Sequence, residues 1–412
     1  MQRRILSIIA VGAAAGCGRQ ATPAPAPAPA DAWLAAWTAS ADTAHRTAFL
    51  AVFDLRPGSA TFGRVVRVVP AGPGSRGTHH TEHLLQSDGL LFADDFGTGR
   101  SYVFDLNDPA HASLHSTFTT AGPFGWPHSY VRLANGDRLV TYQFQASKFD
   151  RPPGGLAQVR TDGSVVRWSA AHTEAAPDTE VTPYSLEVLP ALDRVVSTST
   201  SMVDSTGVHV QVWRLSDLAL LRTLRIPSTR PHAMDHAMPM GDAMPRHLFP
   251  GEPRLLADGK TVMLATFSCG MFTVTGLATD DPVVTPVYAF PGVDCAVPVT
   301  MGRWWLQTVP ALHAVVVLDI SNPAEPREAS RLVLGDSVAP HWLSADRSGR
   351  RLVMDTGGGH QLYLLRFDPR TGAITRDPSL PVLDMSSVEV PGVGTLTGVP
   401  HGAVFAEGAP GR

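Results

Sequence analysis

The feature that most constrains this chain is an internal repeat with a period of roughly 50 residues. In its clearest copies a histidine is followed eleven residues later by an apolar pair: His128 precedes Leu139–Val140, and His341 precedes Leu352–Val353. A turn lies between the two points, so each copy starts with a β-hairpin. The copies begin at His79, His128, Tyr184, Gly251, Asp294, His341 and His401.

Seven copies of this length predict an all-β fold, a seven-bladed β-propeller that spans residues 32–412. The 37 glycines and 35 prolines fall between short apolar runs, as many strands joined by turns require. The last copy keeps only its inner strands, and the apolar runs at 49–54 and 64–69 can complete that blade, which leaves no open sheet edge. The alternative, a pair of β-sandwiches, explains neither the period nor the short last copy. Only residues 31–48 carry a helix-like pattern.

The first 16 residues are typical of a secretory signal peptide. Arg3 and Arg4 precede an apolar stretch, Ile5–Ala15, that is too short to cross a bilayer as a helix. Small residues at 14–16 lead directly into Cys17, which resembles a bacterial lipobox and predicts a lipid on that cysteine. An ordinary signal peptide with an incidental cysteine is the other interpretation.

Residues 17–31 connect this cysteine to the propeller by alternating proline and alanine, which form a stiff polyproline spacer. We therefore expect a periplasmic protein whose only membrane contact is its lipid anchor. Gly18, where an aspartate would favour the inner membrane, indicates the outer one. The two remaining cysteines, Cys269 and Cys295, form either a disulfide or two buried thiols, because sequence gives no distance between them.

Four of the seven starting residues are histidines, and this sets the expected site. The first strand of each propeller blade lines the central channel, so equivalent residues meet around one mouth. His79, His128, His341 and His401 should converge there, with His80 beside the first. Tyr184, Glu252 and Asp294 take related positions, and the two carboxylates are candidate proton carriers.

Several imidazoles in a narrow channel suit copper, zinc or iron. The alternative is a polar tunnel in which these groups bond to the backbone and do nothing else. A metal site would be lopsided, because the histidines belong to the sixth, seventh, first and second copies. A Met/His-rich segment between the third and fourth copies predicts a loop that collects copper or covers the channel; otherwise it is a polar insertion. Its candidate ligands are His232, Met234, His236, Met238, Met240, Met244 and His247.

Other chemistries lack their motifs. The sequence has no Walker loop, nucleophile elbow, Cys-x-x-Cys pair or His-Glu-x-x-His helix. With a net charge of −4 and no basic block, nothing indicates nucleic-acid binding. The acidic pair Asp94–Asp95 is interpreted as a turn cap.

Several of these segments resemble the selenium-binding protein family, which includes methanethiol oxidases. The resemblance runs from about residue 48 to the end. It is carried by Phe49–Asp54, the His79–His80 pair, Trp126–Ser129, Asp319–Arg327, Ser344–Leu352 and Val399–His401. The resemblance implies a seven-bladed propeller and a copper-dependent oxidation of methanethiol to formaldehyde, hydrogen sulfide and hydrogen peroxide. The family's cysteine pair after the two histidines is replaced here by Thr81–Leu85, so selenium binding through that thiol is not expected.

Three functions are compatible with these patterns. The first is a copper oxidoreductase acting on a small thiol. The second is a non-catalytic lipoprotein that binds or delivers periplasmic copper. The third is a propeller that binds other proteins, a role that many unrelated propellers have.

Overall fold

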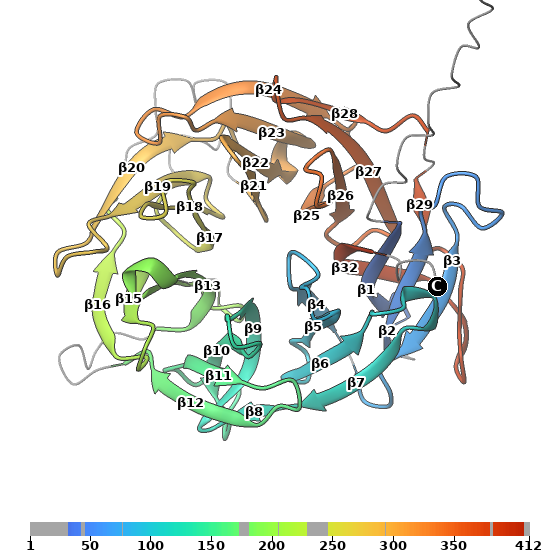
Figure 1. Ribbon diagram of the computed structural model, residues 1–412, viewed down its shortest axis with the longest axis horizontal. Coiled ribbons are helices and arrows are strands. Elements are labelled where there is room, and N and C mark those ends of the chain that lie inside the picture. Colours follow the sequence, from blue (N-terminus) through green and yellow to red (C-terminus); the bar gives the residue numbers. More distant parts are fainter. Residues whose placement is uncertain are drawn as a thin grey trace, which may run out of the picture.

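The computed structural model describes residues 32–42, 46–75, 77–172, 181–204, 206–228, 246–292, 294–379 and 382–407. Seven antiparallel sheets of four or five strands are arranged in a ring, each with one strand nearest its centre (Figure 1). The protein is therefore an all-β, seven-bladed β-propeller, as the repeat predicts. The signal-peptide and linker residues, Cys17 among them, and the loop ligands from His232 to Met244 lie outside the described residues.

Blades 1 to 6 follow one another in chain order, each starting with the strand nearest the centre of the ring (Figure 1). Blade 1 consists of β4 (Thr78–Thr81), β5 (Leu90–Asp95), β6 (Arg100–Asp105) and β7 (Ser113–Phe118). Blade 2 consists of β9 (Phe124–Arg132), β10 (Arg138–Gln145), β11 (Gly155–Val159) and β12 (Val165–Ala170), with β8 (Thr120–Ala121) beside β9. Blade 3 consists of β13 (Pro183–Leu189), β14 (Arg194–Ser199), β15 (His209–Arg214) and β16 (Leu220–Arg225).

Blades 4 to 6 have the same layout. Blade 4 consists of β17 (Pro250–Leu255), β18 (Val262–Thr266), β19 (Gly270–Thr275) and β20 (Val283–Ala289). Blade 5 consists of β21 (Val299–Met301), β22 (Trp304–Val309), β23 (Ala314–Asp319) and β24 (Arg327–Val333). Blade 6 consists of β25 (Pro340–Ala345), β26 (Arg351–Thr356), β27 (Gln361–Asp368) and β28 (Ala373–Arg376), with β29 (Leu383–Asp384) beside β27. A separate hairpin of β30 (Val388–Val390) and β31 (Gly394–Leu396) leads into blade 7.

Blade 7 closes the ring by combining the two ends of the chain. Its innermost strand is β32 (Gly398–Ala406), and the outer three are β1 (Trp33–Ser40), β2 (Ala48–Asp54) and β3 (Val65–Pro70). Ala35 pairs with Val404 on one side and Val52 on the other. The end of the chain thus supplies one strand of this blade, and the N-terminal part supplies three.

The helix-like pattern at 31–48 was therefore misleading, because Trp33–Ser40 is a strand. Its side chains alternate between two cores: Trp33 and Trp37 pack towards blade 1, whereas Leu34 packs towards blade 6. This period of two is hidden by alanines, which favour helices in isolation. Burial between two neighbouring blades outweighs that local preference. Within the described residues, no helix is long and apolar enough to span a membrane.

The remaining cysteines form a disulfide. Cys269 and Cys295 have Cα atoms 5.2 Å apart and are joined through their sulfur atoms. The bond connects the turn between β18 and β19 to the segment that precedes β21, so it links blades 4 and 5. Of the two alternatives for these cysteines, the structure contains the disulfide.

Candidate metal centre

A β-bulge in the innermost strand creates the position at which the polar residues enter the channel. In six blades the pairing between the first two strands shifts by one residue, so that two residues oppose one. Such a bulge re-aims side chains away from the regular alternation of a strand. The paired bulge residues are His79–His80, His128–Ser129, Tyr184–Ser185, Gly251–Glu252, His341–Trp342 and His401–Gly402.

In blade 5 the equivalent position belongs to Val297, and the sequence-based placement of Asp294 is wrong. Val299 pairs with Leu306, and the amide of Ala296 donates to the carbonyl of Thr308, so Val297 lies where the bulge lies elsewhere. Asp294 precedes this position by three residues and is exposed. The hairpin of blade 5 is shorter than those of the clear copies, which shifted the apparent register.

The other histidines do come together in the channel. Two sets of three have ligand atoms that all lie within 4.8 Å of one another: His79, His80 and His128 form one set, and His80, His341 and His401 form the other. The rings of His79 and His80 are stacked with centroids 3.8 Å apart. The structure therefore brings together the five predicted channel histidines, with His80 common to both sets.

The opposite side of the channel offers different groups. Tyr184 packs its ring 3.7 Å from that of His128, Gly251 has no side chain, and Val297 is apolar. The imidazoles are thus confined to blades 6, 7, 1 and 2, which is the lopsided arrangement expected from the sequence. His247, the one loop ligand that the structure describes, is buried near Arg225 and belongs to neither set.

Burial keeps these imidazoles neutral. It lowers the pKa of His128 to about 4 and that of His401 to about 4. Burial, together with the neighbouring imidazole of His401, lowers the pKa of His341 to about 3. The pKa values of His79 and His80 lie well below the ordinary range for the same two reasons. A neutral imidazole has a nitrogen lone pair for a metal ion.

Several ring nitrogens have no hydrogen-bond partner despite being buried. They are His79 Nδ1, both nitrogens of His80, His128 Nε2, His341 Nδ1 and His401 Nε2. A buried polar atom without a partner costs about 1–3 kcal/mol. In a polar tunnel, the backbone would satisfy these nitrogens by hydrogen bonds. Five neighbouring histidines with unused lone pairs fit a metal-binding site better than such a tunnel.

Two buried aspartates stand behind the histidines. Asp94 Oδ2 lies 3.7 Å from His79 Nδ1, and Asp355 Oδ1 lies 3.8 Å from His341 Nδ1. Each aspartate lies opposite a bulge and accepts a hydrogen bond from the backbone amide of the second bulge residue. Asp94 accepts from His80 at 2.9 Å, and Asp355 accepts from Trp342 at 3.0 Å. Burial raises the pKa of Asp94 well above its ordinary value and that of Asp355 to about 7.

The interpretation of Asp94–Asp95 as a turn cap holds only for Asp95. Its Oδ1 accepts from the amides of Gly77 and Thr98, whereas Asp94 faces the histidines. The positions of Asp94 and Asp355 beside the histidines could not be predicted, because a residue opposite a bulge is recognisable only once the bulge is known.

Glu252, the other predicted carboxylate, lies on the channel wall. It accepts hydrogen bonds from Ser185 Oγ and from Arg254 Nη1, the latter at 3.1 Å, and its Oε2 lies 3.6 Å from His83 Nε2. Burial alone would raise the pKa of Glu252, but His83 and the charge of Arg254 together hold it below its ordinary range. Its second oxygen, Oε1, is buried and has no partner.

His83 was not singled out from the sequence. Its ring stacks on Trp342 with centroids 4.1 Å apart and planes within 5°, and its Nε2 lies 2.9 Å from Arg254 Nη2. The residue follows β4, so it lies towards the end of the channel where the innermost strands finish.

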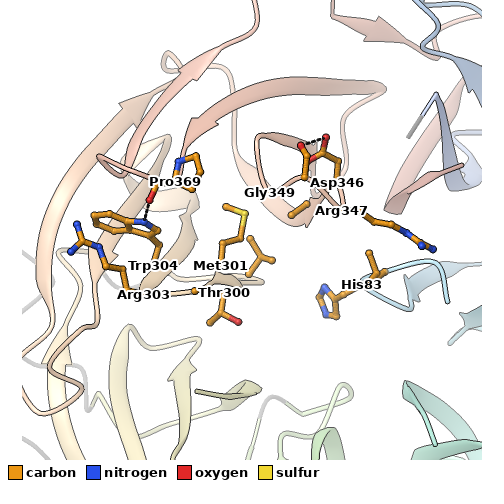
Figure 2. A pocket seen from close by; sticks show the side chains of 14 residues that line it. His83, Thr300, Met301, Arg303, Trp304, Asp346, Arg347, Gly349 and Pro369 are labelled. Carbon is orange, nitrogen blue, oxygen red and sulfur yellow. Dashed lines mark hydrogen bonds between the residues drawn. The ribbon is translucent and has the colours of Figure 1, made fainter. Parts of the chain in front are cut away.

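A cavity of about 240 Å³ reaches the centre from that end. Its wall includes His80, His83, Ser185, Glu252 and Arg254. A broader pocket of about 570 Å³ beside blades 5 and 6 shares His83 with this cavity, and Figure 2 shows that histidine together with Trp304 and Arg347. A small molecule can therefore approach His80 and Glu252 from the end of the channel where the innermost strands finish.

Comparison with known proteins confirms a distant relationship to a methanethiol oxidase. No protein-family model matches the chain. A methanethiol oxidase from Ruegeria pomeroyi is 35% identical over 98 residues, which are 22% of this chain and 22% of that protein. The match thus covers about a fifth of the relative's length, and it bears out the predicted resemblance to methanethiol oxidases as a distant homology.

Solved structures show the same fold. A hypothetical selenium-binding protein from Sulfolobus tokodaii superposes with a TM-score of 0.67 at 14% identity, covering 94% of this chain and 96% of that one. The periplasmic gluconolactonase PpgL from Pseudomonas aeruginosa gives 0.59 at 16% identity, covering 89% and 99%. At these identities the similarity establishes the propeller fold alone.

Proposed function

We propose that this protein is a copper-dependent oxidoreductase that oxidises a small thiol at the histidine centre of its channel. The observation that carries the proposal is the cluster of five neutral imidazoles whose buried nitrogens lack partners. The distant homology to a methanethiol oxidase supports the reaction class.

The donor set favours an imidazole-binding transition metal. His79, His80, His128, His341 and His401 would hold the ion, and nitrogen ligands of this kind suit copper, zinc or iron. Cys269 and Cys295 are joined to each other and so offer no thiolate. Bound copper would supply the one-electron redox steps between a thiol and dioxygen, which zinc does not.

The protein's own groups prepare the substrate. A thiol reacts as its thiolate, so a proton must leave it. Glu252 Oε1 is free to accept that proton, and Glu252 lines the same cavity as His80. From Glu252 the proton can leave to solvent through the cavity that this residue lines. Asp294, exposed and outside the channel position, has no part in this scheme.

The balanced reaction for the simplest substrate consumes methanethiol, dioxygen and water and releases formaldehyde, hydrogen sulfide and hydrogen peroxide. The narrow cavity, about 240 Å³, fits a substrate of this size. The buried centre also keeps bulk water away from the reacting sulfur.

The test measures bound copper and oxygen consumption in the copper-loaded full-length chain. We expect methanethiol to drive oxygen consumption in the wild type and not in the double variant His128→Gln/His341→Gln. A matched control is His360→Gln, which changes an exposed histidine on blade 6. Bound copper without oxygen consumption would overturn the oxidase and leave a copper-binding protein; equal copper in the wild type and the double variant would exclude the channel site.

We also propose that the protein acts in the periplasm, held at the outer membrane by lipid on Cys17. The disulfide between Cys269 and Cys295 supports an oxidising compartment. In cell fractionation, the wild type should sediment with membranes and a Cys17→Ser variant should not. Equal sedimentation would rule out the anchor.

A further inference from the structure

The five histidines are arranged as two sets of three. One set comes from blades 1 and 2, and the other combines His341 and His401 of blades 6 and 7 with His80. Within each set the outer pair is equally close, with ring centroids 4.6 Å apart for His79 and His128 and for His341 and His401. Two sets with one common member give two places for a metal ion.

His80 is the common member, and its surroundings are unusual. It is 2% exposed, and neither Nδ1 nor Nε2 has a hydrogen-bond partner. A metal-binding histidine normally uses one nitrogen for the ion and donates the other N–H to a carboxylate or carbonyl. The ring of His80 has no such second partner, so both of its nitrogens are open to a ligand.

Each set also has a buried carboxylate of its own. Asp94 lies beside His79 of the first set, and Asp355 lies beside His341 of the second. Buried cations need nearby negative charge, because desolvation is costly. The two carboxylates are placed in the same way, each opposite a bulge. Each could balance the charge of one ion, so the pair fits two ions better than it fits a single ion.

We propose that the centre holds two copper ions, one in each set, bridged by the imidazolate ring of His80. This inference rests on the metal-binding part of the proposed function. In the apo protein one nitrogen of His80 carries a proton. When the second ion binds, that N–H bond breaks, a copper–nitrogen bond forms, and the proton leaves to water through the cavity that His80 lines.

The test titrates the full-length chain with copper(II) and measures bound copper per chain together with the intensity of the electron paramagnetic resonance signal. We expect two coppers per chain. The signal should be far weaker than that of two isolated ions, because an imidazolate bridge couples their spins. The variant His341→Gln/His401→Gln should bind half as much copper and show the full signal of a single ion.

A second variant separates the bridge from the two sites. His80→Gln should abolish the coupling, so that any copper still bound gives its full signal, and circular dichroism establishes that the variant folds. One copper per chain in the wild type, or two with the full signal of isolated ions, would overturn the bridged pair while leaving the proposed function intact. Absence of bound copper in the wild type would overturn both.

Discussion

His79 Nδ1 and Asp94 Oδ2 lie 3.7 Å apart, with both groups buried against the wall of the channel. The separation is slightly too long for a hydrogen bond. Asp94 is fixed by the amide of His80, so the same bulge that aims the two histidines also positions their carboxylate. The two histidines of blade 1 and the carboxylate beside them are thus positioned by one local irregularity of the strand.

The first prediction concerns that carboxylate. Asp94→Asn keeps the shape but cannot ionise beside a bound ion, so we expect copper affinity to fall about 10- to 100-fold, as for other residues that support metal ligands. Competition with a copper chelator measures the change. Asp95→Asn alters the neighbouring turn cap and serves as the control, with affinity close to that of the wild type. Equal affinities in both variants would show that Asp94 does not support the centre.

The second prediction concerns Glu252 as the proton acceptor. In Glu252→Gln we expect copper content to stay near that of the wild type and the rate of methanethiol oxidation to fall by about 10²- to 10⁴-fold, the usual contribution of a general base. The loss should shrink at higher pH, where more of the thiol is already ionised. Glu328→Gln, an exposed change on blade 5, is the control. A full rate in Glu252→Gln would remove this residue from the mechanism.

The third prediction concerns stability of the metal-free protein against pH. The pKa values of His128, His341 and His401 are lower in the folded protein than the ordinary 6.5, so the unfolded chain binds more protons as the pH falls. Their stabilising contribution is present above about pH 6.5 and is lost towards pH 4. The raised pKa values of Asp94 and Asp355 act in the opposite direction and reduce the net effect.

Urea unfolding in the presence of a chelator, at pH 7 and pH 5, measures this dependence. We expect a lower free energy of unfolding at pH 5, with up to about 1.4 kcal/mol per pH unit from each titrating histidine. The variant His128→Gln/His341→Gln should show a flatter profile. If its profile matches that of the wild type, these two histidines are not buried as neutral groups.

The fourth prediction concerns closure of the ring. Trp37 in β1 is fully buried and donates its indole N–H to the carbonyl of Asp94 at 2.8 Å, which joins blade 7 to blade 1. Trp37→Ala should cost about 3–5 kcal/mol of unfolding free energy, because it leaves a large cavity. Trp168→Ala, at a side chain that is 49% exposed, should cost far less. Similar losses in the two variants would mean that β1 is not integral to the propeller.

Much of the fold could be predicted from the repeat, because a fixed period of hairpins allows few architectures. The histidines of blades 1, 2, 6 and 7 could be placed for the same reason. Asp294 was misplaced since the spacing rule assumes equal hairpins, and blade 5 has a shorter one. β1 was mistaken for a helix because its alternation becomes visible only when two cores flank it.

The supporting residues could not be predicted at all. Asp94 and Asp355 act from the second strand of their blades, and His83 reaches the channel from a loop after β4. Nothing in their sequence spacing relates them to the histidines, because bulges and loop paths are properties of the folded chain. The disulfide was left open for a similar reason: it depends on a distance between two blades.

X-ray absorption at the copper edge of the loaded full-length chain tests most directly whether imidazoles in the channel bind copper. We expect a first shell of nitrogen with the outer-shell scattering of several imidazole rings, and its loss in His128→Gln/His341→Gln. A shell that contains sulfur, or an imidazole pattern unchanged in that variant, would contradict copper binding by the channel histidines and place the copper elsewhere on the chain.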